Sequence, residues 1–127
     1  MRRYSEILKE KFYGKGWLHP YKIFEQKIFD HVQPNATILD VGCGRTAPVL
    51  KKFVGLGRTL IGIDLCEFKA AGGNASPFFI KSDATAISLK DNTVDLVISR
   101  SALEHLEKPD EVYREVYRVL MPGGDFI

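Results

Sequence analysis

Four polar side chains able to bind a ligand stand at or just beyond the ends of successive apolar runs, 16 to 24 residues apart: Asp40, Asp64, Asp83 and Ser99. Apolar runs that alternate with helical patterns are typical of a parallel sheet covered on both faces. The carboxyl ends of such strands meet at one edge, where ligands bind. One polar strand end can simply face solvent, but four in succession favour a binding rim.

A glycine turn follows the first of these runs. The segment "GCGRTA" fits the pattern G-x-G-x-x-G/A with Gly42, Gly44 and Ala47, and Asp64 stands about 20 residues later, where an acid meets ribose hydroxyls. The pattern alone also fits an NAD-dependent oxidoreductase, or a tight turn that needs glycine for its backbone. Asp40 argues against a pyrophosphate there, because the like-charge contact would cost about 1 kcal/mol or more. A cationic cofactor would be attracted instead.

Hydrophobic periodicity predicts the elements that position these residues. We expect helices over residues 4–12, from Pro20 onward, over 46–54 with Thr46 as N-cap, and over 109–120. We expect strands over 36–41, 58–64, 77–83 and 93–99, and a fifth strand after a turn at "PGG", over 122–127. This alternation predicts an α/β fold.

Composition limits the classes of function. A chain of 127 residues suits one core, and 45% hydrophobic residues with a net charge of +2 are typical of a globular protein without a nucleic-acid partner. No apolar run approaches the roughly 20 residues that span a bilayer, and the N-terminus lacks the pattern of a signal peptide. Cys43 and Cys66 have neither metal nor disulfide spacing. We therefore expect a cytoplasmic protein with no metal site and no membrane partner.

Four segments in order give the sequence a specific resemblance: "ILDVGCG", "LIGIDL", "KSDATAISLKDNTVDLVIS" and "ALEHLEKPDEVYREVYRVLMPGG". From about Thr37 onward the chain resembles a class I S-adenosylmethionine-dependent methyltransferase, of the broad small-molecule group with a DVGCG first motif. The resemblance implies a Rossmann-like, doubly wound, mainly parallel sheet of about five strands with helices on both faces. It also implies S-adenosyl-L-methionine as cofactor and methyl transfer to an unidentified, small-molecule acceptor.

The same resemblance assigns the site residues. Asp40, Gly42, Cys43 and Gly44 would line the methionine part of the cofactor. Asp64 would take the two ribose hydroxyls, with Leu65 against the adenine face, and Asp83 and Ala84 would meet the adenine edge. Ser99 and Arg100 would lie near the transferring methyl group. His105 and His19 are the candidate general bases by residue type, with packing and capping near the following helix as the alternative role of His105. Arg100 is a further catalytic candidate.

The two ends of the chain carry further expectations. Residues 1–35 are predicted to form a helical lid or substrate segment and residues 36–127 the cofactor-binding core. Within the segment, Trp17 and Tyr21 are expected to pack in a core of the first helices, with a place in a substrate pocket as the alternative. The family sheet continues past its fifth strand with a helix and two more strands, whereas this sequence stops at "GGDFI". We therefore expect a truncated chain whose exposed fifth-strand edge supports a homo-oligomer. A non-catalytic S-adenosylmethionine-binding fragment remains a further alternative.

Overall fold

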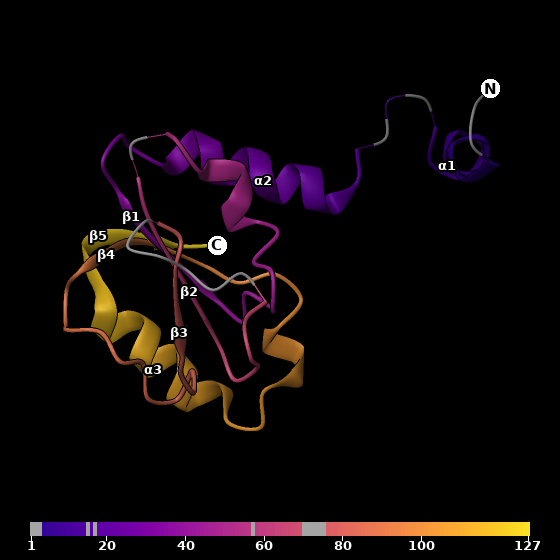
Figure 1. Ribbon diagram of the computed structural model, residues 1–127. Coiled ribbons are helices and arrows are strands. Elements are labelled where there is room, and N and C mark those ends of the chain that lie inside the picture. Colours follow the sequence, from indigo (N-terminus) through magenta and orange to yellow (C-terminus); the bar gives the residue numbers. More distant parts are fainter. Residues whose placement is uncertain (1–3, 15, 17, 57, 70–75) are drawn as a thin grey trace. The chain divides into compact units, whose positions relative to one another are not determined.

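The computed structural model describes residues 4–14, 16, 18–56, 58–69 and 76–127, and the chain divides into two compact units, residues 1–30 and 31–127. The first unit contains α1 (Tyr4–Tyr13) and nearly all of α2 (Pro20–His31) (Figure 1). Pro20 opens α2, where its missing N–H costs little because first-turn N–H groups lack intrahelical partners. Trp17 lies outside the described residues, and Tyr21, expected in a core, is 43% exposed.

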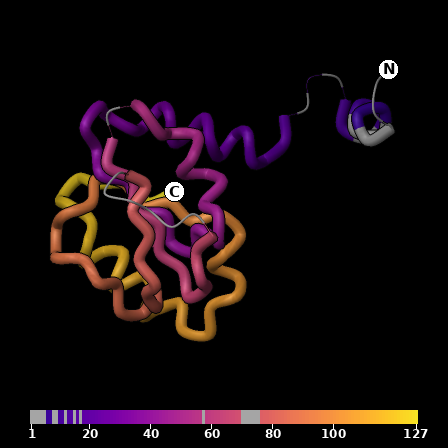
Figure 2. Tube along the Cα trace, viewed as in Figure 1, coloured from indigo at the N-terminus to yellow at the C-terminus, as the bar shows by residue number. Residues whose placement is uncertain are grey.

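The second unit is built on a five-stranded parallel sheet in the order β3-β2-β1-β4-β5 (Figures 1 and 2). The strands are β1 (Thr37–Val41), β2 (Thr59–Asp64), β3 (Phe78–Lys81), β4 (Val94–Ile98) and β5 (Leu120–Phe126). β2 and then β3 lie on one side of β1, whereas β4 and then β5 lie on its other side. The carboxyl end of β1 therefore lies at the switch in strand order, where sheets of this kind bind ligands.

One face of the sheet packs on α3 (Pro109–Val119). The helix presents a stripe at helical spacing, with Val112, Val116 and Val119 each at most 2% exposed. Its partners include Leu39 and Val41 of β1. Because side chains alternate between the faces of a strand, Asp40 points to the opposite face.

The opposite face of β2 meets η1 (Leu50–Phe53), a short 3₁₀ helix with Leu50 and Phe53 fully buried. A Cβ added to Gly62 would lie 2.7 Å from Cys43 Sγ and 3.3 Å from Leu50 Cδ1, so glycine permits this close packing. The predicted α-helix over 46–54, capped by Thr46, is wrong. Pro48 disfavours the right-handed helical conformation for the residue before it, and Ala47 adopts a φ of +43°.

The fifth strand begins earlier than predicted. α3 passes directly into extended backbone at Leu120, and β5 starts there. The pairing with β4 shifts from Val94↔Leu120 to Leu96↔Asp125, so "PGG" forms an irregularity inside the strand rather than a turn before it. The other four predicted strands and the predicted helices at 4–12, from Pro20 and over 109–120 are confirmed within a few residues.

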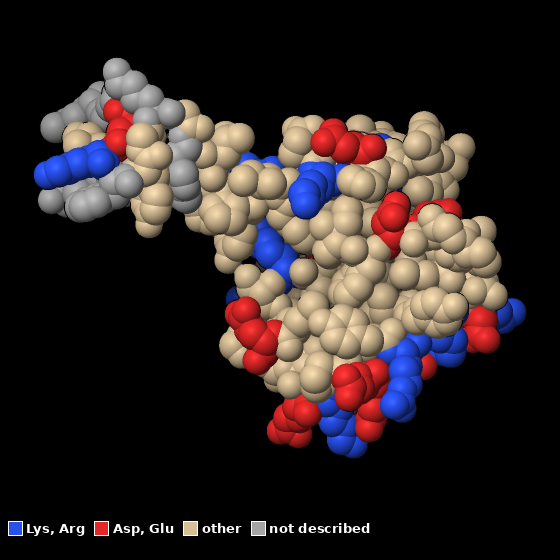
Figure 3. Space-filling view, turned by 180° about the vertical axis from the view of Figure 1, so that it is seen from behind, with Lys and Arg blue, Asp and Glu red and all other residues tan. Residues whose placement is uncertain are grey.

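The surface drawn in Figure 3 mixes the two signs of charge. Acidic and basic side chains are interspersed along the lower edge of the larger unit rather than gathered into a patch of one sign. Among the described residues, no helix has the length and apolar character to cross a bilayer. The same residues contain no group of three or more His, Cys, Asp or Glu side chains placed to hold a metal ion.

Candidate cofactor site

A cavity of about 390 Å³ lies at the carboxyl ends of β1 and β2, within the size range of small-molecule sites. Six of the residues predicted from the sequence line it: Gly42, Asp64, Leu65, Asp83, Ala84 and His105. Its other described walls are mostly apolar and comprise Val41, Ile63, Ser82, Ser101, Ala102 and Leu106. A second hollow of about 250 Å³ lies near the amino ends of β1 and β4, away from the switch point.

The glycine turn after β1 is fixed by hydrogen bonds from its own backbone. The N–H groups of Gly42 and Cys43 both donate to the carbonyl oxygen of Ile63, at 2.9 and 3.1 Å. The N–H of Gly44 donates to Oδ2 of Asp64 at 2.9 Å. Three successive donors are thus engaged within the protein, although this is where a dinucleotide-binding turn would offer N–H groups to a pyrophosphate.

Gly42 lies where the glycine turn comes close to the loop after β4. Its φ is +74°, and an added Cβ would lie 2.5 Å from the Cβ of Ala102. Gly44 has a similar φ of +76°, but an added Cβ there would meet nothing within 4 Å. A substitution at Gly44 would therefore introduce backbone strain alone, whereas one at Gly42 would add a steric conflict with Ala102.

We expect Gly42→Ala to lower the free energy of unfolding by about 2–4 kcal/mol, the sum of left-handed strain and overpacking against Ala102. Gly44→Ala, the matched control, is expected to lose only about 1 kcal/mol, because it carries the strain alone. Urea denaturation of both variants measures the difference. Equal losses would show that the contact with Ala102 does not constrain the turn.

Asp64 is positioned by two backbone donors. Oδ2 accepts from Gly44 N–H and Oδ1 accepts from Cys66 N–H at 3.1 Å. Burial alone would raise the pKa of Asp64, but hydrogen bonds from the backbones of Gly44, Cys66 and Leu65 and from the Cys66 thiol outweigh it, so the pKa lies below its ordinary value. An ionised carboxylate offers about four acceptor positions. The carboxylate also lines the cavity, where it can accept hydrogen bonds from the hydroxyls of a ribose.

The loop after β3 supplies the second carboxylate of the cavity. Asp83 Oδ1 accepts from the Thr85 N–H at 2.9 Å and from the Thr85 hydroxyl at 2.8 Å, and these bonds lower the pKa of Asp83. Ser82, which sequence reasoning missed, is 7% exposed and donates its hydroxyl to the Ala86 carbonyl at 3.2 Å. Its position immediately before an acid that follows a strand was the available signal.

Asp40, the residue before Val41 of the cavity wall, is 3% exposed and is not among the lining residues described. Burial raises the pKa of Asp40 to about 7. The positive charge of Arg100 opposes this shift, and the negative charge of Asp64 adds to it. A carboxyl group that titrates near neutrality thus stands beneath the glycine turn.

Four other predicted residues are not among the lining residues described: Cys43, Gly44, Ser99 and Arg100. Cys43 is 5% exposed, and burial raises the pKa of its thiol to about 12, so the thiol stays protonated. The Ser99 hydroxyl donates to the Val41 carbonyl at 2.9 Å and ties the end of β4 to the end of β1. Arg100 acts electrostatically on Asp40.

Ser101 and Ala102 come directly after Arg100 in the chain. Both line the cavity, and the sequence did not indicate either of them. Ser101 has a φ of +54°, which bends the chain after β4 back toward Gly42. Nothing in the local sequence marks this contact, because serine and alanine occur in every kind of loop.

His105 ends η2 (Leu103–His105) and lines the cavity. Its side chain is 78% exposed, and Nε2 lies 3.5 Å from Oε1 of Glu104. The imidazole therefore has access both to the cavity and to solvent, which a group that accepts a proton and releases it requires.

Comparison with known proteins identifies the family. Residues 39–127 match the family model described as a methyltransferase domain. The chain is 31% identical over 145 residues to a sterol 24-C-methyltransferase of Schizosaccharomyces pombe, covering 94% of this chain and 38% of that protein. It is 29% identical over 129 residues to phosphoethanolamine N-methyltransferase 1 of Arabidopsis thaliana, covering 96% of this chain and 26% of that one.

A solved structure supports the same assignment. An S-adenosylmethionine-dependent methyltransferase from Mesorhizobium loti aligns with a TM-score of 0.66 and 26% identity, covering 80% of this chain and 50% of that one. The chain thus spans half or less of the length of these three proteins. The chain belongs to the methyltransferase-domain family, which confirms the class I S-adenosylmethionine-dependent methyltransferase fold predicted from the sequence and, with it, the cofactor of that family.

Proposed function

We propose that this protein binds S-adenosylmethionine in the cavity at the carboxyl ends of β1 and β2 and transfers a methyl group to a small-molecule acceptor. The observation that carries the proposal is the charge of the cavity wall. Asp64 and Asp83 both line it, both have lowered pKa values, and no Lys or Arg is among its described lining residues. Such a wall favours a ligand that carries positive charge and no phosphate.

The alternative NAD-dependent oxidoreductase fits these observations poorly. A pyrophosphate at the glycine turn would add negative charge near the buried Asp40. The N–H groups of the glycine turn are already engaged, and only the four-residue η1 follows the turn in place of an α-helix whose N-terminus would favour an anion.

The residues of the cavity have distinct parts in this proposal. When bound, the cofactor supplies a methyl group on a positively charged sulfur, already activated for displacement. Asp64 accepts hydrogen bonds from the ribose hydroxyls, with Leu65 against the adenine face. Asp83 accepts from the adenine amine through Oδ2, since its described bonds engage Oδ1, and Ala84 N–H donates to the ring. Asp40 contributes negative charge behind the methionine end.

The acceptor site is proposed on the side of the cavity that His105 lines. His105 would accept a proton from a hydroxyl or amine nucleophile, while Arg100 and Ser99 remain proposed neighbours of the transferring methyl group. Residues 1–35 lie before the part matched by the family model, and we propose that they form a helical substrate segment. The two curated relatives name a carbon and a nitrogen acceptor, so both types belong in a substrate panel.

Calorimetry with S-adenosylhomocysteine and with NAD tests the cofactor assignment. We expect saturable binding of the first and none of the second; the reverse would overturn the proposal. Transfer of a labelled methyl group to a panel of sterols and phosphorylated amines tests catalysis. Binding without turnover across the panel would favour the non-catalytic alternative.

We also propose that two copies pair through the outer edge of β5. β5 ends the strand order and pairs with β4 alone among the described strands, and an edge strand presents unpaired N–H and C=O groups. Light scattering is expected to show a dimer at high concentration, and Met121→Lys on this edge strand is expected to shift it toward monomer. A strict monomer at high concentration would contradict the pairing. A cytoplasmic location, suggested by the two free cysteines, completes the proposal.

A further inference from the structure

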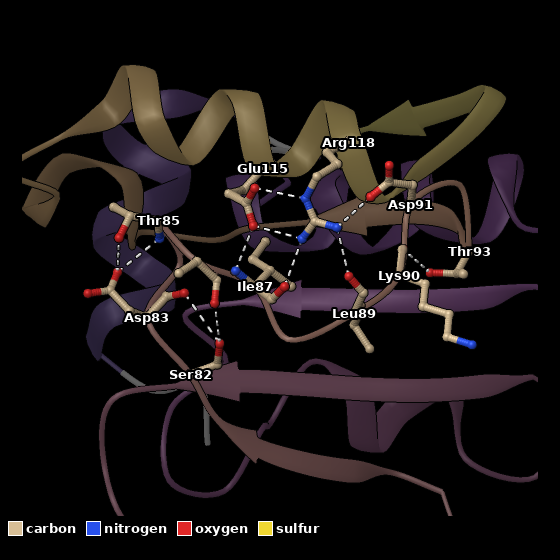
Figure 4. Close-up of polar contacts among 11 residues, drawn as sticks. Ser82, Asp83, Thr85, Ile87, Leu89, Lys90, Asp91, Thr93, Glu115 and Arg118 are labelled. Atoms are coloured by element: carbon tan, nitrogen blue, oxygen red, sulfur yellow. Dashed lines mark hydrogen bonds and ion pairs between the residues drawn. The ribbon is translucent and has the colours of Figure 1, made fainter.

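Arg118, on α3, holds the loop that connects β3 to β4 (Figure 4). A guanidinium has five N–H donors. Nε and one Nη2 donor bond the two oxygens of Glu115, both at 2.8 Å. The other Nη2 donor bonds the Ile87 carbonyl at 2.7 Å, and Nη1 bonds the Leu89 carbonyl and Asp91 Oδ1, both at 2.8 Å. All five donors are therefore used, three of them on the loop.

Glu115 completes the attachment. Its Oε2 accepts from the Ile87 N–H at 2.7 Å, so Ile87 is bonded to α3 through both its N–H and its carbonyl. The Ile87 side chain is 4% exposed and packs in the core beneath. The Arg118 and Glu115 side chains are only 31% and 19% exposed, so solvent screens this pair less than a surface ion pair.

Ile87, where the loop is bonded to α3, lies three residues after Ala84 of the cavity wall. Ala86 precedes Ile87, and its carbonyl accepts from the Ser82 hydroxyl at 3.2 Å. Ser82, Asp83 and Ala84 all line the cavity. Hydrogen bonds from α3 to Ile87 and from Ser82 to Ala86, joined by the Ala86–Ile87 peptide bond, thus connect α3 to the cavity wall. The hydrogen bond from Arg118 also lowers the pKa of Glu115, which keeps the pair charged at neutral pH.

We propose that Arg118 and Glu115 are positioning residues for adenine recognition: they fix the loop so that Asp83 and Ala84 face the adenine edge. The inference rests on the proposed function, because it assigns a task to a loop of the same cavity. Lysine cannot replace the arginine, since a single ammonium cannot satisfy a carboxylate, two carbonyls and a second carboxylate in this planar fork arrangement.

The test compares two ligands that differ only at the adenine edge. S-inosylhomocysteine carries a carbonyl oxygen where S-adenosylhomocysteine carries the amine. We expect Arg118→Lys to weaken S-adenosylhomocysteine binding about tenfold, because small displacements of positioning groups have effects of this size or larger. Binding of the inosine analogue should change little, so the preference for adenine collapses. Arg114→Lys, at an exposed arginine four residues earlier on α3, is the matched control and should keep the preference.

Each outcome of the titrations has a consequence. A preference for adenine that stays unchanged in Arg118→Lys, or affinities for both ligands that fall together as from general destabilisation, overturns the inference. Glu115→Gln keeps the side-chain shape while it removes the charge, and it should lose part of the preference even if Arg118→Lys does not fold. A wild-type protein that binds neither ligand refutes the proposed function, and the inference falls with it.

Discussion

Asp64→Asn is expected to weaken S-adenosylhomocysteine binding by a factor of about 100 to 1,000. The carboxylate accepts one backbone N–H on each oxygen and lines the cavity, where the ribose hydroxyls would donate to it. An amide has one oxygen and one NH₂, so one of the backbone donors, from Gly44 or Cys66, would face another donor. Losing two hydrogen bonds to a charged group costs about 3–4 kcal/mol, which corresponds to this change in affinity.

The control for Asp64→Asn is Asp95→Asn. Oδ2 of Asp95 also accepts a backbone N–H, from Thr37 at 2.8 Å, but it lies at the other end of the sheet. This variant should lose stability without losing affinity. Calorimetry below the melting temperature of all three proteins separates the two effects. An Asp64→Asn protein that binds like the wild type would show that the ribose lies elsewhere.

The sheet could be predicted because buried parallel strands leave a plain signal. Apolar runs such as "ILDV" and "DLVI" alternate with helical patterns along the chain, and this alternation is typical of a parallel sheet with both faces covered. The helix over 109–120 was predictable for a related reason, since Val112, Val116 and Val119 follow helical spacing into the core.

The segment 46–54 shows where periodicity fails. Val49, Leu50 and Phe53 are all buried, and their spacing fits an α-helix as well as it fits a turn followed by a 3₁₀ helix. The conformation of Ala47, constrained by Pro48, decides between them. Similarly, the residues "PGG" predict a turn, but in the structure they lie within β5, where the pairing with β4 is irregular.

Some residues of the candidate site could likewise be predicted from the sequence, and others could not. Asp64 and Asp83 were predictable because strand order alone brings strand ends together. Ala102 was not, because its contact with Gly42 joins positions 60 residues apart through a bend at Ser101. Arg118 looks like an ordinary helix charge in the sequence, and its role depends on carbonyl groups whose positions only the loop's path determines.

Asp40→Asn is expected to stabilise the free protein at pH 8 while it weakens cofactor binding. Burial raises the pKa of Asp40 from 3.8 to about 7. Between these values the folded protein keeps a proton that the unfolded chain has released, so wild-type stability falls as the pH rises from about 4 to 7 and is level above 7. This difference of about three pKa units corresponds to about 4 kcal/mol of folding stability. Asparagine has no such penalty, so the stability gap should grow from near zero at pH 4 to a few kcal/mol at pH 8.

The binding side of the same prediction has the opposite sign. A ligand that brings positive charge near Asp40 favours its ionised form, so wild-type affinity for S-adenosylhomocysteine, which carries an ammonium group, should rise as the pH passes through about 7. Asp40→Asn should bind about tenfold more weakly at pH 8 and lose this rise. Urea denaturation and calorimetry from pH 5 to 8 measure both effects, with exposed Asp110→Asn as control. A variant less stable than the wild type at pH 8, or one that keeps the pH-dependent affinity, would mean that the buried carboxyl group serves the fold and not the cofactor.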